Sequence, residues 1–159
     1  MKRLISVVVP VTGIAVLGIA IAAWADQPRD GNGGQHRGTT ITMIERATTD
    51  ATTDTGASGD SAGDVLTFAN DVFDAADAQK IGTNQGYCIR VVGGASYECT
   101  WTTFLAGGQI VVSGPFYDAK DSTLAVTGGT GRYRKARGTM KLHALANGTK
   151  FSFVFELSG

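Results

Sequence analysis

The sequence predicts an all-β fold, an eight-stranded antiparallel barrel, and two observations point to it. Apolar runs of strand length alternate with turns from residue 64 to the C-terminus. The glycine-rich stretch LAVTGGTGRYRKARG, residues 124–138, is not followed by a helical apolar period. It therefore predicts a tight reversal between two strands and not a phosphate-binding loop that opens a helix. Eight strands are the number at which a barrel interior just holds side chains or one small ligand.

The first expected strand, 39–47, is separated from the rest by a long polar stretch. The other seven follow one another closely, at 65–73, 81–92, 97–105, 109–117, 122–127, 139–145 and 150–157. Hairpin turns are expected at Ala106-Gly107-Gly108 and at Ala146-Asn147-Gly148. The last strand places its phenylalanines on one face and Val154 on the other, so both faces are partly apolar. Such a barrel would fill its inside and bury part of its outside, as in a homo-oligomer.

The N-terminal 25 residues have the pattern of an export signal. Lys2 and Arg3 precede an apolar run, 4–24, and the small-residue pattern Ala23-Trp24-Ala25 suggests cleavage before Asp26. The alternative is an uncleaved membrane anchor, because the run is nearly long enough to span a bilayer. We expect a secreted protein that has no membrane contact after cleavage. Residues 26–38 are polar and glycine-rich and predict a flexible spacer, and residues 39–159 form the barrel domain.

The charge balance bears on the kind of partner, and the composition of residues 48–63 bears on the kind of loop. The whole chain has 14 basic and 14 acidic residues, so loss of Lys2 and Arg3 leaves 12 against 14, a net charge of about −2. This balance does not favour nucleic acid as a partner. The stretch 48–63 is rich in Thr, Asp, Gly and Ser and predicts a long mobile loop, which is either functional or disordered.

Four motifs carry a resemblance to a known family. They are GDVLTFANDVFD (63–74), IGTNQGYC (81–88), SGPFYD (113–118) and LAVTGGTGRYRKARG (124–138). In this order, at these spacings, the region resembles the allene oxide cyclase and dirigent-type β-barrels. The resemblance implies an eight-stranded barrel, oligomers that are commonly trimers, and an interior that takes a small hydrophobic molecule without a cofactor.

Glu45 and Asn70 are the first candidate catalytic residues. Glu45 shares the strand face of Ile41 and Met43, where a carboxylate is costly to ionise unless it has a partner. By alternation alone it lies either inside the barrel or at a solvated rim. The resemblance favours the interior, since the matching acidic residue faces the cavity and steadies positive charge on an opened epoxide. Asn70 is a satisfied core residue or a ligand donor, and the resemblance implies that it helps to hold a water.

The two cysteines, Cys88 and Cys99, support rival interpretations. The resemblance places Cys88 at the cavity as a free catalytic thiol. If Gly93-Gly94 is a two-residue turn, however, Val92 faces Ala95, and Cys88 lies opposite Cys99. Directly opposed Cα atoms about 4.5–5.5 Å apart can be bridged, and export favours a disulfide over the thiol.

Aromatic residues supply the candidate ligand-binding surface, or else simply the core: Phe68, Tyr87, Trp101, Phe116 and Phe153. Neither a zinc-type Cys/His cluster nor a cofactor motif is found in the sequence, so we expect no metal and no cofactor. The sequence thus predicts an exported barrel that binds a small hydrophobic molecule and steers its cyclisation or isomerisation. The alternative is a binding, dirigent-like or structural barrel without turnover; the oligomer would be a trimer or a dimer.

Overall fold

All eight expected strands are present in the structure, a computed structural model that describes residues 38–158. A short additional strand, β2, lies within the expected loop. The elements are β1 (Thr39–Arg46), β2 (Ala51–Thr53), β3 (Val65–Phe73), β4 (Lys80–Val92), β5 (Ser96–Leu105), β6 (Gly108–Tyr117), β7 (Ser122–Gly129), η1 (Gly131–Tyr133), β8 (Arg137–Leu145), η2 (Ala146–Gly148) and β9 (Lys150–Ser158). Together these strands form a closed antiparallel barrel.

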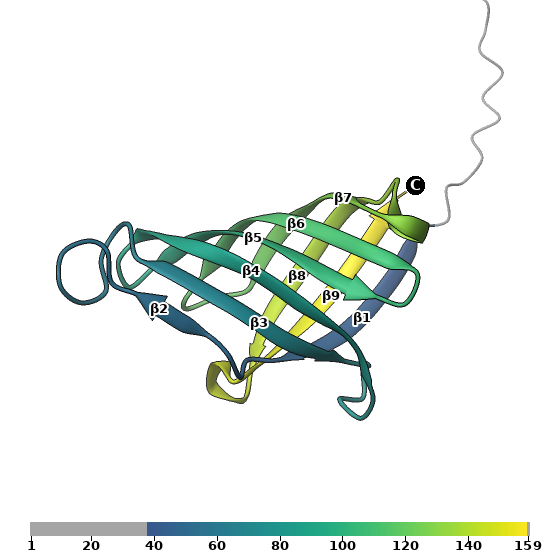
Figure 1. Cartoon of the computed structure of the whole chain (residues 1–159), viewed down its shortest axis with the longest axis horizontal. Helices are drawn as coiled ribbons and strands as arrows, with labels where there is room; N and C mark the ends of the chain where they lie inside the picture. Colours follow the sequence, from purple (N-terminus) through teal and green to yellow (C-terminus); the bar gives the residue numbers. More distant parts are fainter. Residues whose placement is uncertain (1–37, 159) are drawn as a thin grey trace, which may run out of the picture. The chain divides into compact units, whose positions relative to one another are not determined.

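Closure depends on pairing between strands that are distant in sequence. The sheet runs in the order β1-β9-β8-β7-β6-β5-β4-β3-β2, and β1 pairs with β3 to close the ring. Figure 1 shows β3 to β6 wrapping around toward β7, β8, β9 and β1. The closing contact is short, from Ile44 opposite Phe73 to Arg46 opposite Asp71, and β2 pairs with the other end of β3. Between β1 and β2, residues 47–50 leave the ladder.

The interior is filled by one face of each strand. Met43, Ile110, Val112, Met140 and Phe155 have no exposed side-chain surface. Except at Met43, which is followed by the buried Ile44, they alternate with partly or fully exposed residues along their strands. Burial of these apolar side chains is the main source of stability, at about 25 cal/mol per Å² of apolar surface removed from water.

The glycine-rich stretch forms the expected reversal. Strand β7 ends at Gly129, and η1 makes the turn into β8. Gly131 has φ +57°, and its Cα lies against the backbone of Gly107, so a residue with a side chain would be both strained and crowded here. The Arg132 N–H donates to the Gly107 carbonyl at 2.8 Å, which ties the turn to the neighbouring hairpin.

Residues 48–63 differ from the mobile loop that their composition predicts. Apart from β2, the stretch is held by carboxylates: Asp64 accepts hydrogen bonds from the Thr55 and Ser61 N–H groups at 3.0 and 2.8 Å. Asp60 pairs with Arg90, whose guanidinium is nearly buried and also pairs with Asp118. The prediction was wrong because polar composition does not reveal partners that only the fold supplies.

The export signal and the spacer fall on residues outside the described range, so they remain predictions. Within residues 38–158, the structure contains no helix with the length and apolar character needed to cross a bilayer.

Candidate functional site

The site lies at the short seam where β1 meets β3. Glu45 is the second-last residue of β1 and pairs with Val72, so its side chain faces the barrel interior and is 5% exposed. Asn70, on the same inner face of β3, donates from Nδ2 to Glu45 Oε1 at 2.8 Å. Strand alternation leaves two positions open for Glu45, inside the barrel or at a solvated rim. The structure places it inside.

Asn70 also shapes the bend between β1 and β2. Its Oδ1 accepts from the backbone N–H groups of Thr48 and Thr49, both at 3.0 Å, and from the Thr49 hydroxyl at 2.9 Å. Its second Nδ2 hydrogen reaches Asp50 Oδ1 at 2.7 Å. The side chain of Asn70 thus satisfies the backbone N–H groups of Thr48 and Thr49, which lie outside the ladder, and brings the carboxylate of Asp50 to the site. All of its hydrogen-bonding capacity is used by protein, so it holds the site together.

The surroundings of Glu45 bring the pKa of its carboxyl group close to neutral pH. Burial disfavours its ionised form and raises its pKa from 4.5 to about 7, against the hydrogen bond from Asn70 and the nearby amide of Asn84, which both lower it. The charge of Asp50 raises the pKa a little further. At neutral pH both forms of Glu45 are populated, so it can give or accept a proton.

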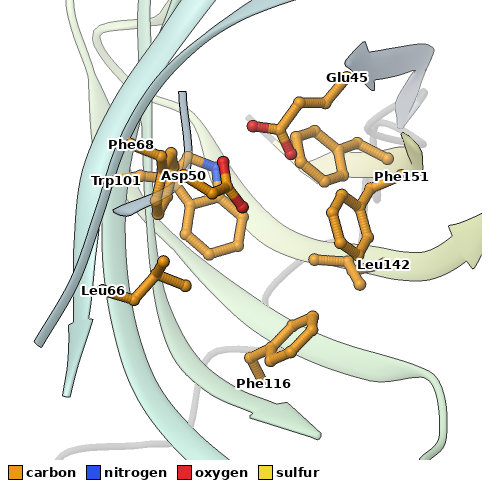
Figure 2. Close-up of a pocket in the computed structure, with 9 residues that line it drawn as sticks. Glu45, Asp50, Leu66, Phe68, Trp101, Phe116, Leu142 and Phe151 are labelled. Carbon is orange, nitrogen blue, oxygen red and sulfur yellow. The ribbon is translucent and has the colours of Figure 1, made fainter. Parts of the chain in front are cut away.

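A cavity of about 200 Å³ lies beside this carboxyl group. Figure 2 shows Glu45 and Phe116 at opposite ends of it, with Asp50 near the acidic end. The remaining wall is apolar and mostly aromatic, formed by Leu66, Phe68, Trp101, Phe116, Leu142, Phe151 and Phe153. The rings meet edge-on or tilted, with centroids 5.9 Å apart for Phe68 and Trp101 and for Phe116 and Phe151. The cavity joins a polar, proton-exchanging end to an aromatic enclosure.

The structure places four of the five aromatic candidates on this wall and one elsewhere. Tyr87 is 49% exposed on the outer face of β4, so its assignment to the cavity was wrong. The reason is the pleat: its neighbour Cys88 points inward, and successive residues of a strand point to opposite sides. Sequence reasoning missed Asp50, Leu66, Leu142 and Phe151. Alternation could have found the last three, since each shares a face with an inner residue of its own strand.

Cys88 and Cys99 form a disulfide inside the barrel, with Cα atoms 4.0 Å apart and both residues nearly buried. The register inferred from the Gly93-Gly94 turn is confirmed at Cys88–Cys99 and at Arg90–Tyr97. Closer to the turn an irregularity pairs Val92 with Ser96, where Ala95 was expected. The catalytic thiol assigned to Cys88 was therefore wrong, because its sulfur is already bonded.

The part of the chain that the structure describes offers no group of three or more His, Cys, Asp or Glu side chains placed to hold a metal ion. The acidic end consists of Glu45 and Asp50, each already bonded to Asn70. Of these two carboxyl groups, Glu45 is the one suited to exchanging a proton with a ligand near neutral pH.

Comparison with known proteins agrees with this geometry. A family model described as allene oxide cyclase matches residues 41–159. Among solved structures, pyocyanin demethylase is 26% identical, with a TM-score of 0.66 over 76% of this chain and 100% of its own. AbnU, an exo-specific intermolecular Diels-Alderase, is 13% identical, with a TM-score of 0.63 over 77% and 98%. The pterocarpan synthase dirigent protein GePTS1 is 16% identical, with a TM-score of 0.59 over 77% and 87%. The last two show the fold alone.

Proposed function

Because this chain belongs to the allene oxide cyclase family, we propose that it binds a small hydrophobic molecule in its barrel and steers that molecule's cyclisation or isomerisation. Family membership and the cavity together support a ligand-binding, cyclase-like barrel. The observation that carries the catalytic part is Glu45, a carboxyl group with a pKa of about 7 at the end of an aromatic cavity.

Confinement is the first part of the proposed mechanism. A flexible substrate held against Phe116, Phe151 and Phe153 loses the extended conformations that do not lead to ring closure, and this ordering lowers the barrier. The cavity is smaller than the 300–1,000 Å³ typical of sites for drug-sized ligands. The substrate is therefore compact or only partly enclosed.

The carboxyl group of Glu45 is the second part of the proposed mechanism. In its neutral form it donates to an oxygen of the substrate, and in its ionised form it stabilises positive charge that develops during bond reorganisation. Asn70, which is itself fixed by Asp50, keeps Glu45 in place, and the apolar wall strengthens the field of Glu45 by excluding water. No step of this scheme requires a cofactor.

The alternative function is a barrel that binds a ligand without converting it. The aromatic wall favours a flat aromatic ligand for such a role. Binding followed by product analysis separates the two functions.

Substitution of Glu45 by glutamine is expected to lower conversion about 100-fold or more while ligand affinity changes little. Trp101 lies on the cavity wall and is the one tryptophan left if Trp24 is removed with the leader, so quenching of its fluorescence reports binding. Conversion is followed by chromatography and mass spectrometry with unsaturated, epoxide-containing and flat aromatic compounds. The matched control is Glu156→Gln, the same change on the outer face of β9. Equal conversion by Glu45→Gln and wild type would contradict the proposal.

A second copy of the chain is the proposed protein partner. Tyr87, Ile89, Val91 and Val92 on the outside of β4 are 44–54% exposed. The neighbouring outward residues Thr67, Thr100 and Thr102 carry no charge, and among the described residues the one charged cross-strand neighbour is Glu98, opposite Ile89. Such a surface favours burial against another barrel. We expect the wild type to elute as a dimer or trimer in size exclusion with light scattering, and Ile89→Glu to elute as a monomer. Elution of the wild type as a monomer at micromolar concentration would contradict this.

A further inference from the structure

A row of buried polar side chains crosses the inside of the barrel next to Glu45. Asn70 on β3 pairs with Asn84 on β4, and Asn84 pairs with Thr103 on β5. Their side chains are 1%, 1% and 0% exposed. Directly paired residues on one face of a sheet have Cβ atoms about 4.5–5.5 Å apart, so neighbouring side chains in this row touch.

The side-chain amides of Asn70 and Asn84 differ in whether hydrogen bonds hold them in one orientation. Asn70 is locked, because Oδ1 accepts three hydrogen bonds and Nδ2 donates to both carboxylates. Turning its amide over would point oxygen at Glu45 and Asp50. Among the described residues, neither Nδ2 nor Oδ1 of Asn84 has a hydrogen-bond partner in regular geometry, and Thr103 Oγ1 has none either. A buried amide without hydrogen-bond partners destabilises the fold, so this freedom requires an explanation.

Glu45 supplies the explanation, since Asn84 is paired with Asn70, which itself donates to Glu45, and the amide of Asn84 also lowers the pKa of Glu45. An amide has a donor at one end and an acceptor at the other, in groups of nearly equal size, so it can turn over without displacing its neighbours. An ionised carboxylate needs the donor, and a neutral carboxyl needs the acceptor.

We propose that Asn84 is a reversible positioning residue for Glu45. It donates from Nδ2 when Glu45 is ionised and accepts at Oδ1 from the Glu45 O–H when Glu45 is neutral. Asn84 itself neither gains nor loses a proton; the proton on Glu45 is exchanged with the ligand or with solvent in the cavity. The proposal rests on the proposed function, in which Glu45 exchanges that proton.

Few other charges influence this exchange. From the bend after β1, Asp50 faces Glu45 across Asn70 Nδ2. From β3 the facing residues are Asn70 and Val72, and from β9 and β8 they are Phe151, Phe153 and Leu142. Arg46 and Lys150 point away and bind Asp77. Asn70 thus serves as a fixed donor and Asn84 as the partner that follows the protonation state, so both forms of Glu45 are hydrogen-bonded in an apolar cavity.

The test is a pH titration of the folded protein by NMR, with the carboxyl carbon of Glu45 and the side-chain amide of Asn84 followed together. We expect the Asn84 amide signals to move with the same midpoint as Glu45, near pH 7. In Glu45→Gln, the Asn84 signals should no longer titrate. In Asn84→Leu, the Glu45 midpoint should shift upward, because both hydrogen bonds are lost and the one to the charged carboxylate is the stronger.

Thr103→Val is the matched control, since it removes the other unpartnered polar group of the row but none that acts on Glu45. Asn84 signals that stay still while Glu45 titrates would overturn the proposal, as would an equal shift of the Glu45 midpoint in both variants. If Asn84→Leu does not fold, the titration of the Asn84 amide in the wild type and in Glu45→Gln still tests the proposal. Joint titration in a protein that converts none of the ligands would refute the proposed function and leave this inference standing.

Discussion

Glu45→Gln is expected to be more stable than the wild type at pH 8, by up to about 3 kcal/mol, although the proposed catalysis predicts that it converts ligand more slowly. The pKa of Glu45 rises from 4.5 in the unfolded chain to about 7 in the folded one, and each unit corresponds to about 1.4 kcal/mol. Below pH 4.5 the group is protonated in both states and costs nothing. Between pH 4.5 and 7 the unfolded chain ionises this carboxyl group while the folded protein keeps it protonated, so stability is progressively lost relative to a variant that cannot ionise, and above pH 7 the loss is complete.

The measurement is the free energy of unfolding in urea at several pH values from 4 to 8. The difference between Glu45→Gln and the wild type should grow from pH 4.5 to 7 and then level off. Glu156→Gln is the control with the opposite sign, because the hydrogen bond and charge of Lys141 lower the pKa of Glu156. A difference between Glu45→Gln and wild type that does not change with pH would show that Glu45 has an ordinary pKa.

Removal of the disulfide is the second change with a large expected effect. Cys88 and Cys99 are 11 positions apart, and closing a loop of this length stabilises a fold by about 3 kcal/mol in the chain-entropy account. We expect Cys88→Ala/Cys99→Ala to melt on the order of 10 °C lower than the oxidised wild type. The cavity should survive, since its wall does not include either cysteine.

Thermal unfolding with and without reductant measures this loss. Reduced wild type is the packing control, because its thiols still fill the space that the double alanine variant empties. An unchanged melting temperature on full reduction would contradict the prediction. Intact mass of the same protein, recovered outside the cell, tests export as well: we propose a mature chain that begins at Asp26, with both cysteines resistant to alkylation until reduced.

Local sequence information predicted most of the fold. Turn residues such as Gly107, Gly131 and Asn147-Gly148 separate runs whose period of two is visible without a partner strand. The Cys88–Cys99 pair followed from the same logic, since a short turn determines which residues face each other. Alternation also indicated that Glu45 shares a face with Met43, and the fold places both inside.

The site was only partly predictable. Asp50 sits in a polar stretch with nothing local to distinguish it from Asp54 or Asp60, and it reaches the cavity because Asn70, 20 residues later, binds the bend. The order in residues 54–64 comes from Arg90 and from Asp64, whose partners are likewise set by the fold. Tyr87 was assigned to the wrong side because aromatic character was given more weight than strand alternation.

The sequence by itself determined the strands, their inward faces, the turns and the disulfide, because each of these depends on residues that are close in the chain. Only the tertiary structure decided which carboxyl groups share the cavity, how strongly Glu45 resists ionisation, and which asparagine keeps a free amide. Those properties depend on the closure of β1 onto β3 and on the water that this closure excludes. Burial and hydrogen-bond partners arise between distant segments, and no local pattern encodes them.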